Sequence, residues 1–467
     1  MLESNLHSRY NPRGEAVRYV DSLNLNSGIE CFILIEPGFG YLVTALREKF
    51  KNSKIIVLHI ENSFPPLNVP TMHGTELSEV QDFLEREVPE TEVANIKIIE
   101  WRPSLNFYKQ AYVSLLSLVV EFIKRMDAGN RTTAAFGRKW VGNFFRNIGN
   151  VRKILLYRSM DMPVIITGSG PGLEKAVPVI QKIQEECLVI AASSSVMALS
   201  HYGITADIVI TTDGGGWALR HIYPFFRKSN CAAKSGAEYG ASFAVNLCAA
   251  LPSQCRSIPF LIMNDGSFWQ SVILHELSIP SVIIQQKGTV TACAVELALT
   301  LTSGNIFLAG MDLSVKDIRT HARPYAFDHL LFDSGGRFTP VYSQSFTRSR
   351  QIQEGGSLDI YAAWFKKQLV SWPKRIFSLG GSHEVFENAL CTEAVNRKNI
   401  SGYFNAVDVK NDPADFRKRA ACALIAALKN SDYAINLKTE LALLLFAGEK
   451  NVTDRQIETA INEAAYG

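Results

Sequence analysis

The feature that most constrains the fold is an alternation of short apolar runs with segments of helical periodicity, which begins near residue 163. The apolar runs cover residues 163–167, 187–192, 206–211, 258–263, 281–285 and 305–309. Short buried strands that alternate with helices are typical of a mostly parallel sheet with helices on both faces. We therefore predict an α/β fold with a Rossmann-like, doubly wound central sheet.

The length of the chain indicates more than one domain, because a single core rarely serves all of 467 residues. A first β-α-β unit, "CFILIEPGFGYLVTALREKF" followed by "SKIIVLHIE", predicts a smaller Rossmann-like α/β domain over 1–105. We expect a helical connector over 106–160, broken near Gly129, and a central ligand-binding domain over 161–390. The region 391–467 should be helical, because 413–467 is rich in Ala, Leu and Lys at helical spacing. We expect it to form a cap or an interaction surface, through which the protein could self-associate.

Composition narrows the class of protein. The chain is 47% hydrophobic and 20% charged with a formal charge of +3, so nothing in its charge favours a nucleic-acid partner. Its eight cysteines are scattered and form no C-x-x-C pair, which is typical of reduced core residues in a cytosolic protein. The first residues lack the apolar region of a signal peptide, and no stretch reaches the about 20 apolar residues of a membrane span. We predict a soluble, cytoplasmic protein.

A glycine-rich turn follows the first strand of the long alternation, in "VIITGSGPGLEKA". It consists of Gly168, Ser169, Gly170, Pro171 and Gly172. In a doubly wound sheet, ligands bind beyond the carboxyl ends of the strands, where a helix N-terminus favours phosphate. The turn therefore predicts a phosphate or nucleotide site, with a tight turn that holds no ligand as the alternative.

Three familiar motifs do not fit this turn. A P-loop needs Lys and Ser or Thr after its last glycine, whereas Leu173 follows Gly172. The third glycine of a dinucleotide fingerprint is also replaced by Leu173, and no acid follows the next strand. Ser169 is not central in a G-x-S-x-G elbow. A mononucleotide or a phosphate is the ligand that remains.

Polar residues follow other strands of the same sheet, where they would share one crevice. One serine suffices to cap a helix, so a run of three leaves others to bind ligand. An aspartate that precedes three glycines can contact ribose hydroxyls or cap its own turn. The residues at these strand ends are Ser193, Ser194 and Ser195, then Asp213, then Gly288, Thr289, Val290 and Thr291, and finally Asp312.

The first β-α-β unit carries a partial motif of its own. Gly38 and Gly40 follow its first strand, and Glu61 follows the second, as in half of a dinucleotide or methyl-donor fold. The third glycine position is Val43, so the fingerprint is incomplete. A purely structural turn is the alternative.

Four segments, taken in order, resemble the motility accessory factor family: "TGSGPGLEKAVPVI", "AASSSVMALSHYGITADIVITTDG", "QKGTVTACAVELALTL" and "IFLAGMDLS". The resemblance covers roughly residues 20–390. Members of that family look like glycosyltransferases that modify flagellin with nonulosonic acids, which are sialic-acid-like sugars. They share a central domain with archaeal 6-hydroxymethylpterin diphosphokinase-like proteins and are similar in fold to sialyltransferases that use CMP-activated donors.

The resemblance implies a role for each strand end. Gly168 to Gly172 would line the CMP phosphate and ribose, Ser193 to Ser195 with Asp213 would hold ribose or base, and Gly288 to Thr291 with Asp312 would complete the nucleotide cleft. It implies transfer of the sugar to Ser or Thr of flagellin, in support of flagellum assembly and motility, with an inverting or retaining outcome left open. No cofactor and no metal are expected, because the leaving group is a single phosphate and the chain has no D-x-D motif.

The catalytic candidates are His321, as the base, and Asp213. His321 lies in "RTHARPYAFD" just beyond the last strand and has an ordinary pKa suited to proton transfer; an exposed loop histidine is the alternative. Arg323 and Tyr325 are candidates for substrate binding. The segment "FGRKWVGNFFRN" (136–147) could contact the nucleotide sugar or flagellin, or simply pack its aromatic side inward.

Two further functions stay open. One is an ATP- and Mg²⁺-dependent pyrophosphokinase acting on a pterin, which would need carboxylates such as Asp213 and Asp312 to hold the metal. The other is a flagellin-binding assembly factor without catalytic activity.

Overall fold

The computed structural model divides the chain into two compact units, Met1–Gly137 with Ala442–Lys450 and Arg138–Leu441 with Asn451–Gly467. Helix α6 (Gln110–Asn150) begins in the first unit and ends in the second. The structure describes residues 2–26, 28–88, 95–227, 242–285, 288–354, 357–380, 382–388, 402–410, 412–430, 434–449 and 451–466.

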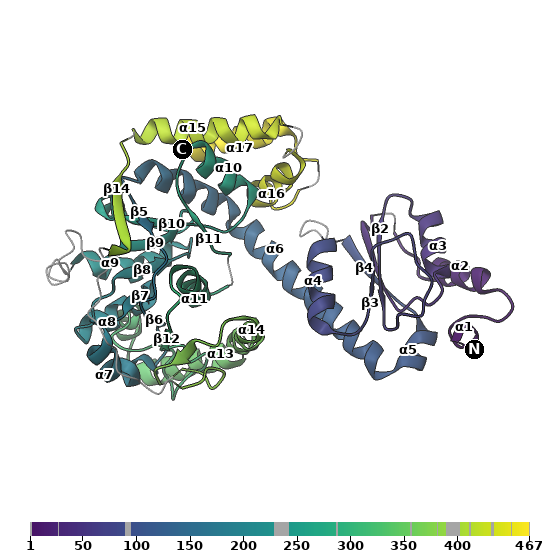
Figure 1. The fold of residues 1–467 in the computed structure, drawn as a ribbon, viewed down its shortest axis with the longest axis horizontal. Coiled ribbons are helices and arrows are strands. Elements are labelled where there is room, and N and C mark those ends of the chain that lie inside the picture. The colour runs from purple at the N-terminus through teal and green to yellow at the C-terminus, as the bar shows by residue number, and fades with distance from the viewer. Residues whose placement is uncertain are drawn as a thin grey trace. The chain divides into compact units, whose positions relative to one another are not determined.

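The first unit contains a parallel sheet in the order β3-β2-β1-β4, with the central strand β1 buried along its whole length. Helices α2 and α3 pack on one face of the sheet, and α4 with the first part of α6 packs on the other (Figure 1). The elements before α6 are α1 (Leu2–Leu6), α2 (Pro12–Ser22), β1 (Cys31–Ile35), α3 (Tyr41–Lys49), β2 (Lys54–His59), β3 (Thr71–His73), α4 (Leu77–Glu87), β4 (Ile96–Glu100) and α5 (Arg102–Tyr108).

The second unit contains the larger sheet, in the order β13-β12-β6-β7-β8-β9-β10-β5-β14, with β11 paired to β10. Its described pairings are parallel except that of β14 with β5, which confirms the predicted Rossmann-like, mostly parallel α/β fold. The strands are β5 (Lys153–Tyr157), β6 (Val164–Thr167), β7 (Leu188–Ala192), β8 (Ile208–Thr211), β9 (Ser242–Asn246), β10 (Phe260–Asn264), β11 (Val282–Ile283), β12 (Ile306–Ala309), β13 (Ile376–Ser378) and β14 (Phe404–Asp408).

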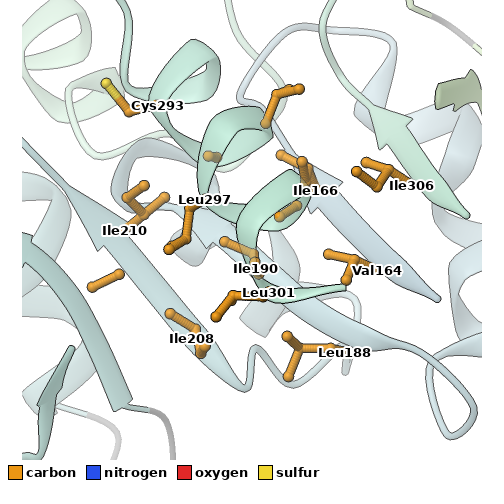
Figure 2. Close-up of a cluster of buried hydrophobic side chains, with 14 of the residues drawn as sticks. Val164, Ile166, Leu188, Ile190, Ile208, Ile210, Cys293, Leu297, Leu301 and Ile306 are labelled. Atoms are coloured by element: carbon orange, nitrogen blue, oxygen red, sulfur yellow. The ribbon is translucent and has the colours of Figure 1, made fainter. Parts of the chain in front are cut away.

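Helix α11 (Val290–Leu301) forms the centre of the largest core. Figure 2 shows its Cys293, Leu297 and Leu301 lying over the apolar side chains of β6, β7 and β8. The other helices of this unit are α7 (Leu173–Ile183), α8 (Val196–His201), α9 (Leu219–Arg227), α10 (Phe268–Glu276), α12 (Asp328–Asp333), α13 (Val341–Glu354), α14 (Ser357–Ser371), α15 (Pro413–Leu428) and α17 (Asp454–Tyr466), with short 3₁₀ turns η2 (Ser193–Ser195), η3 (Gly216–Ala218) and η4 (Ser253–Ser257). Helix α16 (Ala434–Phe446) begins in this unit and ends in the first.

The region between the two predicted domains differs from the expected connector. Helix α6 continues through Gly129, because one glycine costs a helix only about 1 kcal/mol and the apolar side chains on both sides of it are buried. Residues 153–157, expected to be helical, form strand β5, since a short apolar run cannot be assigned by periodicity alone. Strands β9 and β14 were also not predicted.

The C-terminal helices α15 and α17 pack within the second unit. Helix α15 contacts α10 and α17, and the Glu440 carboxylate in α16 accepts the N–H groups of Phe268 and Trp269 at the start of α10, at 3.0 and 3.1 Å. A carboxylate at a helix N-terminus satisfies otherwise unpaired donors, so this contact fixes α16 to α10. Among the described helices, none is both long and apolar enough to cross a bilayer.

Between β6 and β12 the order of the strands reverses, which makes this position a topological switch point of the sheet. From β6 the chain builds β7, β8, β9 and β10 on one side, and later returns to build β12 and β13 on the other. The connections that leave β6 and β12 therefore diverge, and ligands of doubly wound sheets bind in the crevice between such connections.

The last turns of α6 are joined to the carboxyl edge of the sheet by two buried asparagines. Asn147 Nδ2 donates to the carbonyl oxygens of Leu247 and Ala249, both at 2.8 Å, and Asn143 Nδ2 donates to those of Gly214 and Cys248. Since Asn147 is 3% exposed, water cannot replace its hydrogen bonds.

We expect Asn147→Leu, which keeps the size of the side chain, to lower the free energy of unfolding by about 2–4 kcal/mol, because two buried carbonyls lose their donor. Urea unfolding followed by circular dichroism measures this change. Lys124→Leu, at an exposed position of the same helix, is the matched control and should change stability by less than about 0.5 kcal/mol. Equal effects of the two substitutions would contradict the assignment.

Candidate functional site

The glycine turn after β6 is hydrogen-bonded to the end of β12. Gly168 N–H donates to the Ala309 carbonyl and Gly170 N–H to the Gly310 carbonyl, both at 2.8 Å. Gly172 N–H donates to the two carboxylate oxygens of Asp312, at 2.8 and 3.0 Å. Three amide groups expected to bind phosphate therefore already have acceptors within the protein.

Close packing explains why this turn is rich in glycine. A Cβ atom at Gly170 would lie 2.0 Å from Asp312 Oδ2, and one at Gly168 would lie 2.5 Å from the Gly310 carbonyl oxygen. Gly310 itself has a φ of 68°, a conformation that favours glycine. A larger side chain at Gly170 would disturb the fold, so a ligand at this turn is better probed through Ser169, its half-buried polar residue.

Asp312 is 8% exposed, and burial raises its pKa to about 6 although the Gly172 N–H group opposes the shift. Its contact with Gly172 joins the segments that follow β6 and β12. The sequence predicts that Asp312 belongs to the nucleotide site. In the structure, its carboxylate accepts a hydrogen bond from Gly172 N–H within the protein.

Residues 319–323 lie directly against the glycine turn. Ala322 N–H donates to the Ser169 carbonyl at 2.8 Å. Glu174, in the first turn of α7, accepts from Arg319 Nη1 at 3.0 Å with both carboxylate oxygens and from Arg323 N–H at 3.0 Å. Since Glu174 and the turn belong to one strand-turn-helix unit, these contacts fix the segment that carries His321 against the turn.

The His321 ring is largely enclosed, unlike that of an exposed loop histidine. It stacks on the Tyr325 ring, with centroids 3.9 Å apart, and its Nδ1 lies 2.8 Å from Thr320 Oγ1. Burial lowers the pKa of His321 to about 4, with Arg348 and His221 adding to the effect, so its pKa is not the ordinary one expected from sequence. The imidazole is neutral at pH 7, and the tautomer that donates Nδ1–H to Thr320 leaves Nε2 to accept a proton.

A small pocket surrounds His321 and contains residues that the sequence did not single out. Arg348 of α13 and Asp328 at the start of α12 line it together with His321 and Tyr325. His221 of α9 adjoins it, with its ring centroid 5.3 Å from that of Tyr325. No strand-end pattern marks these residues, because they come from helices that reach the crevice only through tertiary packing.

Tyr325 and His221 are both shielded from solvent. Burial raises the pKa of Tyr325 to about 12 and lowers that of His221, while the negative charge of Asp213 favours the protonated form of His221. Asp213 is therefore close enough to His221 for its charge to act on that ring. Its side chain is exposed, and its Oδ1 accepts from Gly215 N–H at 2.7 Å, the contact expected if Asp213 caps its own turn.

The three serines after β7 differ in their surroundings. Ser195 is fully buried, with its Oγ 2.9 Å from Thr167 Oγ1 and donating to the Ala192 carbonyl at 2.8 Å. Ser193 is buried as well, whereas Ser194 is half-buried. Ser194 is therefore the serine best placed to contact a ligand, and Ser195 already has partners in the protein.

The start of α11 contributes a capped helix end. Gly288 has a φ of 75°, and Thr289 Oγ1 accepts from Ala292 N–H at 3.1 Å while Thr291 donates to Thr289 Oγ1 at 3.3 Å. Val290 is the first residue of the helix. Helix capping accounts for Thr289 without a ligand.

The end of the segment 136–147 packs its aromatic side inward, which is one of the two interpretations predicted, whereas Phe136 at its start is exposed. Phe144 and Phe145 are fully buried. Trp140 lies against Gly214, so this helix also supports the turn that carries Asp213.

The glycine turn of the first unit is filled by the chain's own side chains. Phe39 N–H donates to His7 Nε2 at 3.1 Å, and a Cβ atom at Gly38 would lie 2.3 Å from the same nitrogen. A Cβ atom at Gly40 would lie 2.5 Å from Leu67 Cδ2. These contacts favour the structural interpretation of this partial motif.

Three comparisons show which known proteins this chain is similar to. Residues 140–317 match the family model described as 6-hydroxymethylpterin diphosphokinase MptE-like. This part of the chain is similar to the MptE-like family. The matched segment extends from the last turns of α6 past β12 and so includes the glycine turn, Asp213 and Asp312.

An uncharacterized protein of Treponema pallidum (strain Nichols) is 27% identical over 305 residues, which are 65% of this chain and 64% of that protein. The match thus spans less than two thirds of the length of that relative. The structure of MAf glycosyltransferase from Magnetospirillum magneticum AMB-1 has the same fold, with a TM-score of 0.51 and 13% identity over 97% of this chain and 78% of that one. The MptE-like match and the shared fold support the resemblance to the motility accessory factor family.

The raised pKa of Asp312 makes stability depend on pH. Folding raises this pKa from about 3.8 to about 6, so the folded state loses stability relative to the unfolded state as pH rises through this interval. We expect Asp312→Asn, which keeps an oxygen acceptor for Gly172 N–H, to be more stable than the parent above pH 7 by on the order of 1–3 kcal/mol and to lose this advantage near pH 4. Thermal unfolding between pH 4 and pH 8 measures the difference. The exposed Asp317→Asn variant should behave as the parent, and an Asp312→Asn curve parallel to the parent's would contradict the prediction.

Proposed function

We propose that this protein is a glycosyltransferase that binds a CMP-activated sugar in the crevice between the ends of β6 and β12. The observation that carries the proposal is the attachment of the His321 segment to the glycine turn through Ser169 and Glu174. This attachment puts a neutral imidazole at the switch point of the sheet, where nucleotides bind in doubly wound folds. The shared fold with a MAf glycosyltransferase supports the same reaction class.

In the proposed reaction, the hydroxyl oxygen of an acceptor serine or threonine attacks the anomeric carbon of the donor sugar. A carbon–oxygen bond forms there while the bond to the CMP phosphate breaks, and CMP leaves with the electron pair. His321 Nε2 takes the proton of the attacking hydroxyl. Ser169, Ser194 and Asp213 hold the nucleotide, with Asp213 also acting on His221, and Tyr325 and Arg323 contact the sugar.

The donor and acceptor follow from the family resemblance rather than from the pocket. We propose a nonulosonic sugar as donor and Ser or Thr of flagellin as acceptor, in the cytoplasm, in support of flagellum assembly and motility. No cofactor is required by this reaction, since cleavage of a sugar–phosphate bond needs only a base and groups that stabilise the leaving phosphate. Self-association through the C-terminal helices is compatible with this role.

The MptE-like match favours a second candidate, an ATP- and Mg²⁺-dependent pyrophosphokinase that acts on a pterin. That reaction would need Asp213 and Asp312 as metal ligands. Both carboxylates accept backbone N–H groups here, Asp312 with its two oxygens and Asp213 with Oδ1. This use of the carboxylates favours the transferase.

Calorimetric titration with CMP, and in parallel with ATP and Mg²⁺, tests the proposal. We expect CMP to bind without metal, in the parent and in His321→Gln alike. Release of CMP from a CMP-activated nonulosonic acid in the presence of flagellin should fall by about 10²-fold or more in His321→Gln. His201→Gln, at an exposed histidine of α8, is the control and should keep the parent rate.

Other outcomes point to the alternatives. Preference for ATP with Mg²⁺ would favour the pyrophosphokinase. Flagellin binding without affinity for either nucleotide would favour an assembly factor that has no catalytic activity.

A further inference from the structure

Three arginines line the pocket around His321, and two of them are neutralised. Arg319 pairs with Glu174, with Nη1 at 3.0 Å from a carboxylate oxygen, and Arg323 Nε lies 3.9 Å from Asp328 Oδ1. Arg348 is different, because no carboxylate of the described chain forms an ion pair with it. The pocket therefore carries one uncompensated positive charge, at its α13 side.

The surroundings of Arg348 are ready to receive a charged ligand. Arg348 is exposed, so its guanidinium can be reached from solvent without an opening of the pocket. Ser345, three residues earlier on α13, is buried and lines the same pocket, which puts a hydroxyl on the same side of the helix. His321 and Tyr325, whose rings stack on each other, line the same pocket as Arg348, and its positive charge acts on both.

A guanidinium binds carboxylates and phosphates through two parallel hydrogen bonds, which gives both affinity and orientation. We propose that Arg348 is the residue that binds the anionic group of the donor, a carboxylate of the sugar or the phosphate of the nucleotide. This inference rests on the proposed transferase function and identifies the donor as an acidic compound held beside His321.

Such binding would also change the basicity of the His321 imidazole. The positive charge of Arg348 is one of the causes that keep the imidazole unprotonated, and a bound anion offsets that charge. The other charged or titratable groups that face the ring from neighbouring elements are His221, Tyr325, Asp328, Arg319 and Arg323, of which the last two are paired with carboxylates. His321 would therefore be a stronger base in the donor-bound protein than in the free protein.

The test compares three probes on the same protein: CMP, which carries only the phosphate; N-acetylneuraminate, which carries only the carboxylate; and cytidine, which carries neither. We expect Arg348→Gln to lower the affinity for one of the two anionic probes by about 10-fold or more, and Arg348→Lys to lower it less. The affinity for cytidine should not change. The anionic probe that loses affinity identifies the group that Arg348 binds. Arg350→Gln, two residues on and paired with Glu354 at 2.6 Å, is the matched control and should bind all probes as the parent does.

A second readout follows the imidazole itself. Nuclear magnetic resonance titration of His321, assigned by comparison with His321→Gln, should show a pKa that rises when the anionic probe saturates the parent, and a smaller rise in Arg348→Gln. A merely structural role of Arg348 would leave this difference at zero.

The outcomes separate the two proposals. If CMP binds and Arg348→Gln changes neither its affinity nor that of N-acetylneuraminate, the inference about Arg348 is wrong and the transferase stands. If the parent binds N-acetylneuraminate through Arg348 but has no affinity for CMP, Arg348 is an anion-binding residue as inferred, but the proposed CMP-dependent function is wrong. If neither anionic probe binds the parent, both are wrong.

Discussion

The contact on which the rest of the site depends is the backbone pairing between the turn after β6 and the end of β12. Gly168 and Gly170 donate to Ala309 and Gly310, and Asp312 closes the contact at Gly172. Parallel neighbours whose connections diverge would otherwise leave an open gap at this point. Here the gap is narrowed by glycines that let two backbones approach within hydrogen-bond distance.

This contact fixes where the other parts of the site lie. Because the turn leads directly into α7, Glu174 stands at a defined position and holds Arg319 and Arg323. The segment between these arginines carries His321 into the pocket that α12 and α13 complete. A side chain that the sequence marks as a candidate base is thus positioned by main-chain hydrogen bonds and one ion pair.

Most of the fold could be predicted from sequence, because buried strands and amphipathic helices leave strong periodic patterns. Strands β6, β7, β8, β10 and β12 were expected within one or two residues of their observed bounds. Strand β5 was missed, since a run such as "KILLY" has no period of its own and becomes a strand only through pairing with β10 and β14. The continuity of α6 through Gly129 likewise depends on packing that no local pattern reveals.

The candidate site could be predicted in part. Strand-end motifs pointed to the carboxyl edge of the sheet and to His321, but they could not indicate that Asp312 and Ser195 have partners inside the protein. Arg348 and His221 lie on helices that ordinary sequence patterns describe only as amphipathic, so their approach to His321 is a property of the tertiary structure. The partial glycine motif of the first unit looked similar in sequence, yet His7 and Leu67 occupy the space beside its glycines.

The central claim is that a cytidine nucleotide binds between the ends of β6 and β12. A crystal structure of the protein soaked or grown with CMP tests it most directly. The account predicts CMP beside Ser169 and Ser194, with its phosphate or the vacant sugar position next to His321. Nucleotide bound instead at the Gly38–Gly40 turn of the first unit, or elsewhere with the crevice empty, would contradict it.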